Sequence, residues 1–141
     1  MSTSTHPFLV RLQQATDDHD LDALVACFAP GYRNETPAHP GRSFGGTEQV
    51  RANWQQIFAF VPDITSRVTG HAVDGSEVWS EWELSGTRID GTPHLMRGVI
   101  VFGLEGDRAA WARFYLEPVE HDGVDVGGAV RAQVHADDGP R

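Results

Sequence analysis

Three tight-turn signals divide the second half of the chain into four segments. Each signal is an acidic residue followed by glycine: Asp74-Gly75, Asp90-Gly91 and Glu105-Gly106. Apolar side chains recur at about every second position in the segments that these turns separate, which are 64–73, 77–89, 94–104 and 108–118. Such alternation is typical of strands, and connections this short join antiparallel neighbours. The pattern predicts a four-stranded antiparallel meander.

The first half of the chain has a helical period instead. Apolar residues recur every three or four positions in three segments, which begin at Thr5 and Pro7, at Asp20 and at Thr47. We expect the second helix to end at Pro30-Gly31 and the third at Pro62. Three helices followed by an antiparallel sheet predict an α+β domain with two layers.

Length, charge and cysteine content exclude several classes of function. The 141 residues suffice for one domain, expected at 1–121, before a flexible tail at 122–141 that is rich in Gly and Asp. A net charge of −9 argues against nucleic acids and membranes as partners. The single cysteine excludes an internal disulfide and a Cys-based zinc cage. With no long apolar run and no secretory signal, we predict a cytoplasmic location.

Both faces of the predicted sheet carry large apolar side chains. One helical layer covers only one face, so the other is expected to be an interface between two copies of the chain. The residues expected on this outer face are Trp79, Val99, Val101 and Phe114. The sequence thus predicts a homodimer that forms through the outer face of the sheet.

The order of the elements and two stretches of sequence resemble a known superfamily. DLDALVACFAP at residues 20–30, and the run from Gly106 into WARFY at residues 111–115, are similar to the SnoaL-like branch of the nuclear transport factor two-like superfamily. The resemblance extends from about Phe8 to Glu120. It implies a cone fold, in which three N-terminal helices pack in the concave face of a curved, mainly antiparallel four-stranded sheet around one deep pocket.

This superfamily includes polyketide cyclases, ketosteroid isomerase, limonene epoxide hydrolase and non-catalytic binders, so the fold implies no single reaction. The positions of the catalytic residues of ketosteroid isomerase correspond to Leu12, Thr36 and Gly98. The base of the cyclases corresponds to Arg113 and their helper histidine to Gly98, which leaves His94 out of register. The known catalytic sets are therefore not repeated in this chain.

One polar motif of the family is retained. Tyr32-Arg33-Asn34 resembles the Tyr-x-Asn step at the pocket mouth of the cyclases and the epoxide hydrolase. Because Tyr32 and Asn34 are two positions apart on an extended segment, both side chains can point the same way. They are interpreted as a donor–acceptor pair for a substrate oxygen or a water, or alternatively as a half-buried tyrosine and a turn asparagine.

Three charged or titratable residues complete the predicted catalytic group. Arg113 lies in an apolar strand and is expected either to clamp an anionic oxygen or to form an ion pair, for instance with Glu35 or Glu117. Glu35 and His39 belong to the loop 34–46, expected to cover the pocket, so either could act as a general base or be an exposed loop residue.

Seven further residues are expected to bind the substrate: Leu12, Trp54, Phe58, Trp82, Met96, Trp111 and Tyr115. The histidines lack the i, i+4 spacing of metal ligands, so we expect neither metal nor cofactor. The prediction is a cofactor-independent enzyme that isomerises, cyclises or adds water to a mostly apolar carbonyl, epoxide or hydroxyl compound with a polar or anionic group. The alternatives are a non-catalytic binding protein that uses the same pocket, and a structural dimer whose pocket is filled by its own side chains.

Overall fold

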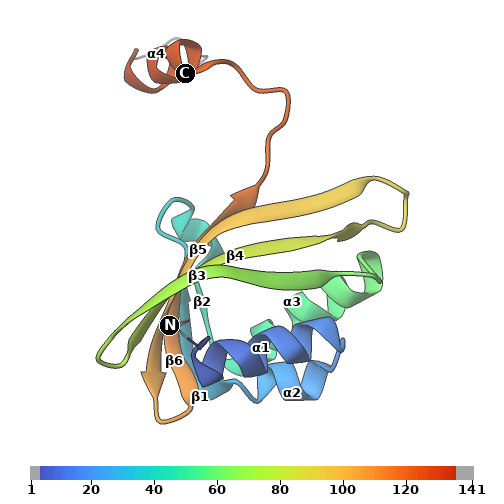
Figure 1. Cartoon of the computed structure of the whole chain (residues 1–141), viewed down its shortest axis with the longest axis vertical. Coiled ribbons are helices and arrows are strands. Elements are labelled where there is room, and N and C mark those ends of the chain that lie inside the picture. The colour runs from blue at the N-terminus through green and yellow to red at the C-terminus, as the bar shows by residue number, and fades with distance from the viewer. Residues whose placement is uncertain (1–3, 136–141) are drawn as a thin grey trace.

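The computed structural model describes residues 4–135, in which three helices pack on one side of a curved sheet (Figure 1). The helices are α1 (Pro7–Asp17), α2 (Leu21–Val25), α3 (Thr47–Phe60) and α4 (Val126–Val134), with a 3-10 turn, η1 (Pro40–Arg42). The strands are β1 (Phe28–Glu35), β2 (Phe44–Gly45), β3 (Thr65–Asp74), β4 (Glu77–Thr87), β5 (Pro93–Glu105) and β6 (Arg108–Pro118). No helix among these residues is long and apolar enough to span a membrane.

The three predicted helices are present, with small changes at the starts of α1 and α3 and an earlier end of α2. His6, rather than Thr5, caps α1: its Nδ1 accepts a hydrogen bond from the backbone N–H of Phe8 at 3.1 Å, and Pro7 is the first helical residue. Gly46 precedes α3 with a φ of 89°, so Thr47 is the first residue of the helix and not its cap.

The sheet contains the predicted meander and two further strands. Its strand order is β2-β1-β6-β5-β4-β3, and the antiparallel pairs from β3 to β6 confirm the turns at Gly75, Gly91 and Gly106. β1 runs parallel to β6, and the short β2 lies antiparallel to β1. The α+β class is confirmed, but the prediction of four strands was wrong because the sheet has six.

The missed strand β1 begins where a helix was expected to continue. Asp20 caps α2 by accepting a hydrogen bond from the N–H of Ala23, but the helix ends at Val25. Pro30 cannot donate to a helical ladder, and it is tolerated in β1 because β2 pairs with β1 only at Arg33 and Asn34. The chain therefore leaves the helical layer early and adds an edge to the sheet.

The pairing of β6 with β5 decides which side chains face the helices. Phe114 lies opposite the buried Ile100, on the concave face, whereas Arg113 lies opposite Val101, on the outer face. Trp111 and Tyr115 share the outer face with Arg113, because side chains alternate along a strand. The expectation that these three residues face the pocket, and that Phe114 faces outward, was wrong by one position.

The core lies between the helices and the concave face. Phe8 and Leu12 of α1 pack with Trp82 of β4 and with Ile100 and Phe102 of β5. The rings of Phe8 and Phe102 make an edge contact with their centroids 4.8 Å apart. This packing fixes the helical layer at one end of the sheet.

Helix α4 was not predicted. It begins after Asp125, which caps it by accepting a hydrogen bond from the N–H of Gly128 at 2.8 Å. In Figure 1 it stands apart from the sheet, at the end of an extended segment. The proposed flexibility of 122–141 stays a prediction, and its last part, 136–141, lies outside the described residues.

Gly98 allows the backbones of β5 and β6 to approach closely. Its φ is +153°, and a Cβ atom there would overlap the carbonyl oxygen of Tyr115. We therefore expect Gly98→Ala to lower the free energy of unfolding by about 2 kcal/mol or more, because strain and overlap add. Urea denaturation measures this. Gly31→Ala is the control, since a Cβ there meets nothing within 4 Å; equal stability of the two variants would contradict the expectation.

Candidate functional site

A cavity of about 310 Å³ opens on the concave side of the sheet. Its apolar wall comes from β1, α3 and the inner faces of β4, β5 and β6, and includes Phe28, Trp54, Leu84, Met96 and Phe114. The volume lies at the lower end of the range for small-molecule sites, about 300–1,000 Å³. An apolar pocket is therefore present between α3 and the concave face of the sheet.

Three polar side chains from β1 and the residue after it form a chain of hydrogen bonds along one side of the cavity. The hydroxyl of Tyr32 donates to Oδ1 of Asn34 at 2.8 Å, and Nδ2 of Asn34 lies 3.5 Å from Oγ1 of Thr36, to which it donates. All three residues are buried. Burial raises the pKa of Tyr32 well above its ordinary value of 10.0, so the phenol stays protonated at neutral pH.

This arrangement leaves hydrogen-bonding capacity for a ligand. The Tyr32 oxygen has lone pairs beyond the bond that it donates, and the Asn34 amide has a second N–H. Both residues line the cavity. Tyr32 and Asn34 can therefore hold a polar atom of a ligand against an otherwise apolar wall.

His94, at the start of β5, lines the same cavity and is half-buried. Burial and, to a lesser extent, the positive charge of Arg88 hold the pKa of His94 below its ordinary value of 6.5. Its imidazole is therefore neutral at pH 7 and can accept a proton. His94 was left out of the predicted site because it does not align with the helper histidine of the cyclases. Its position two residues before Met96 in the same strand would have placed it on the pocket face.

Two further polar residues mark the opening of the cavity. Arg42 comes from η1 and Asn53 from α3, and both are more exposed than the deep residues Tyr32 and Val50. Nη1 of Arg42 lies 4.0 Å from Oε2 of Glu117. Neither residue was predicted; the one available signal was that Arg42 belongs to the loop expected to cover the pocket.

Glu35 and Arg113 lie together, but outside the cavity. Their side chains form an ion pair of 3.9 Å on the outer face of the sheet, where β1 and β6 run side by side. The Arg113 guanidinium also lies 4.5 Å from the centre of the Trp111 ring, a cation–π contact. The ion-pair alternative for Arg113 matches this geometry, and its expected position in the pocket was wrong.

His39 also lies beside the cavity and not in its wall. Its Nε2 is 3.1 Å from Oε1 of Glu117, at the end of β6. The contact ties the turn η1 to the sheet next to the opening.

Two of the seven predicted substrate-binding residues, Trp54 and Met96, line the cavity. Leu12, Phe58 and Trp82 pack in or against the core instead: the Phe58 ring stacks on His19 with a centroid distance of 5.0 Å, and Nε1 of Trp82 donates to Oγ of Ser80. The core and the pocket wall are adjacent in this fold, so an apolar pattern alone does not separate them.

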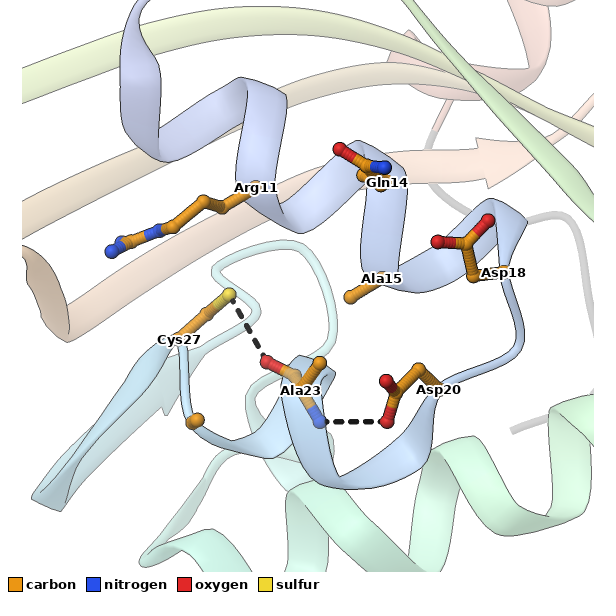
Figure 2. A pocket seen from close by; sticks show the side chains of 8 residues that line it. Arg11, Gln14, Ala15, Asp18, Asp20, Ala23 and Cys27 are labelled. Carbon is orange, nitrogen blue, oxygen red and sulfur yellow. Dashed lines mark hydrogen bonds between the residues drawn. The ribbon is translucent and has the colours of Figure 1, made fainter.

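A second hollow, of about 260 Å³, lies between α1 and α2 (Figure 2). Two of its polar groups are engaged: the Cys27 thiol donates to the carbonyl of Ala23, and the Asp20 carboxylate caps α2. Burial raises the pKa of Cys27, which keeps the thiol protonated and weakly nucleophilic. Arg11 pairs with Asp107 at 3.4 Å. We find no chemistry in this hollow comparable to that of the cavity on the sheet.

Over residues 4–135, no three His, Cys, Asp or Glu side chains lie close enough together to hold a metal ion. The expectation that the protein needs neither metal nor cofactor stays a prediction.

The chain matches one family model, that of the SnoaL-like domain, over residues 9–113. None of the curated proteins that were compared matches it in sequence.

Solved structures share the fold. A hypothetical protein with a ketosteroid isomerase-like fold from Catenulispora acidiphila, in complex with trimethylamine, has a TM-score of 0.69 at 18% identity, over 79% of this chain and 87% of that one. IdmH, a putative polyketide cyclase from Streptomyces antibioticus, has a TM-score of 0.66 at 21% identity, over 77% and 88%. A putative polyketide cyclase from Sinorhizobium meliloti has a TM-score of 0.62 at 20% identity, over 80% and 95%.

Removing the Tyr32 hydroxyl tests the buried hydrogen-bond chain. Tyr32→Phe leaves Oδ1 of Asn34 without its donor in a buried site, so we expect the free energy of unfolding to fall by about 1–2 kcal/mol. Urea denaturation provides the measurement. In the control Ser76→Ala, the hydroxyl lost belongs to an exposed residue in the turn between β3 and β4, and the change should stay within about 0.5 kcal/mol. A Tyr32→Phe variant as stable as this control would contradict the role given to the hydroxyl.

Proposed function

Because the chain belongs to the SnoaL-like domain family, we propose that it acts on a mostly apolar small molecule held in the cavity on the concave side of the sheet. The reaction is a cofactor-independent isomerisation, cyclisation or water addition at a carbonyl, epoxide or hydroxyl group. One observation carries this proposal: a half-buried imidazole that is neutral at pH 7 and a hydrogen-bonded Tyr–Asn pair line the same apolar cavity.

Each of these groups has a proposed role. His94 accepts a proton from the substrate or from a water, and returns it at a later step. Tyr32 and Asn34 orient the substrate oxygen and stabilise the charge that develops on it. Of the five catalytic residues predicted from the sequence, the proposal keeps these two, and His94 replaces Glu35, His39 and Arg113 because those three do not line the cavity.

The comparisons support the reaction class in general terms. Two of the similar structures are described as putative polyketide cyclases, and cyclisation is one of the reactions proposed here. At identities near 20% this likeness concerns the fold, so the proposed chemistry depends on the cavity of this chain.

The second candidate function is binding without catalysis. It is favoured by Leu12 and Gly98, which stand at positions that the resemblance assigns to reactive side chains of catalytic relatives. The Catenulispora protein, similar in fold, is in complex with a small molecule. A structural module with a filled pocket is disfavoured, because the cavity has room for a ligand and polar groups converge on it.

We further propose that two copies of the chain associate through the outer face of the sheet. Trp79 and Tyr115 are 45% and 43% exposed there, beside Val99 and Trp111. Val101 lies beneath them and is buried within a single chain. Burying such large apolar side chains against a second copy removes them from water, which favours association.

Val99→Asp tests the dimer, because it places a charge in the centre of this face. Light scattering at micromolar concentration should give twice the chain mass of 15.5 kDa for the parent protein and the mass of one chain for the variant. Ile89→Asp is the control, since Ile89 is 63% exposed in the turn between β4 and β5 and should leave the dimer intact. A parent protein that is a monomer, or a variant that remains dimeric, refutes the proposed interface.

Proton exchange in D₂O tests catalysis without knowledge of the natural substrate. With an apolar enolisable ketone such as 1-tetralone, the parent protein should speed exchange of the α-protons, as followed by NMR. His94→Gln should lower this rate by roughly a hundredfold, because the general base is lost. The parent rate should also fall as the pH drops through the lowered pKa of His94, below 6.5, since only the neutral imidazole accepts a proton.

The same experiment separates catalysis from binding. Exchange that stays equal in the parent and in His94→Gln, with the ketone bound by both, supports the binding protein and removes His94 from the mechanism. Arg108→Met, an exposed change at the start of β6, is the control and should keep the parent rate.

A further inference from the structure

We propose that the ligand carries a carboxylate, and that Arg42 holds this group at the opening of the cavity. The inference rests on the proposed function, because it requires that the cavity take up a small molecule. It names the class of ligand: an apolar body with one anionic end.

The charge of the cavity wall is the first argument. Among the described residues that line the cavity, Arg42 is the only Arg, Asp or Glu, and the remaining titratable groups, Tyr32 and His94, are neutral at pH 7. Desolvating a carboxylate next to an apolar wall is costly unless a cation compensates it. Arg42 supplies that cation without a competing carboxylate in the wall.

The hydrogen-bonding state of Arg42 is the second argument. Its contact with Glu117 spans 4.0 Å, which is longer than a hydrogen bond, so this ion pair does not use the guanidinium donors. Glu117 itself is bound more closely by His39, at 3.1 Å through its other oxygen. The guanidinium is therefore held near the opening with donors left for a planar, two-oxygen partner such as a carboxylate.

The net charge of the chain argues in the opposite direction. At −9 the protein as a whole repels anions. This repulsion is screened beyond about 8 Å at physiological salt, so the closest charges dominate at the opening. Those are the carboxylate of Glu117, 4.0 Å from Arg42 and bonded to His39, and a second cation, Arg88, whose field contributes to the lowered pKa of His94. The repulsion by the remote acidic residues therefore does not by itself exclude an anion at Arg42.

The distribution of polar groups gives the ligand a direction. Val50 and Ile64 lie in the wall and are 3% and 0% exposed, whereas the Arg42 side chain is 63% exposed. An elongated ligand matches this wall when its apolar part lies against the buried residues and its carboxylate stays at Arg42. Tyr32 and His94 line the same cavity, Tyr32 among its buried residues and His94 among its half-buried ones.

The test compares two aromatic probes of the same shape, 2-naphthoate and the neutral 2-naphthamide. Quenching of tryptophan fluorescence, to which Trp54 in the cavity wall contributes, measures both dissociation constants at pH 7.5 and low salt. We expect the parent protein to bind naphthoate about three- to tenfold more tightly, a modest preference because Arg42 is partly in water. Higher salt should reduce it.

Variants of Arg42 assign the preference to one side chain. Arg42→Met should bring the ratio of the two constants to about one by weakening naphthoate alone, and Arg42→Lys should retain part of it because the charge remains. Arg108→Met, the matched loss of an exposed arginine away from the cavity, should keep the parent ratio. Thermal unfolding confirms that each variant is folded.

The outcomes separate this inference from the proposed function. Equal binding of both probes by the parent protein, or an unchanged ratio in Arg42→Met, refutes the role of Arg42 while the bound amide still supports the cavity as a small-molecule site. Ile57→Trp, which fills the cavity, should weaken both probes together. Binding of neither probe by the parent protein removes support for the cavity and, with it, for the carboxylate.

Discussion

The close approach of β5 and β6 is the contact on which both surfaces of the sheet depend. At Gly98 the two backbones lie nearer than any side chain would allow, and five residues on, the Trp111 ring occupies the space where Gly103 has no Cβ. This pairing turns Phe114 toward the helices and Trp111 with Arg113 away from them. The same register therefore builds the apolar wall of the cavity and the aromatic surface on the outside.

The polar groups of the cavity come together because of the strands that flank this pair. β1 adds to the free edge of β6 and carries Tyr32 and Asn34 to the concave face, while the start of β5 brings His94 to the same cavity. Glu35 alternates with Asn34 and so pairs with Arg113 on the other side of the sheet. One sheet thus keeps its carboxylate–guanidinium pair outside and leaves the cavity with neutral hydrogen-bonding groups.

The sequence predicted those elements of the fold that depend on neighbouring residues in the chain. Acidic-Gly turns fixed the meander, and helical spacing located α1 and α3 within a few residues. The strand β1 was missed because Pro30 reads as a helix stop, whereas its place in the sheet depends on pairing with β6, more than 70 residues away. The orientation of β6 was missed because large apolar groups occupy both of its faces, so alternation gives two equivalent solutions and only the register chooses. Because of this error, Arg113 was predicted in the pocket, although it lies on the outer face of the sheet.

The absence of a carboxylate from the described cavity wall limits what chemistry the site can support. An ionised acid there would be the usual base, whereas in the proposed reaction the base is the His94 imidazole, whose neutral form is favoured by burial. Burial likewise keeps the Tyr32 phenol protonated, so it acts as a hydrogen-bonding partner and not as a base. When a neutral base takes a proton, the wall gains a positive charge, and the negative charge formed on the substrate lies close to it in a poorly screened site. A catalytic step that separates a proton from a carbon acid is therefore better supported by this cavity than one that needs an anionic nucleophile from the protein.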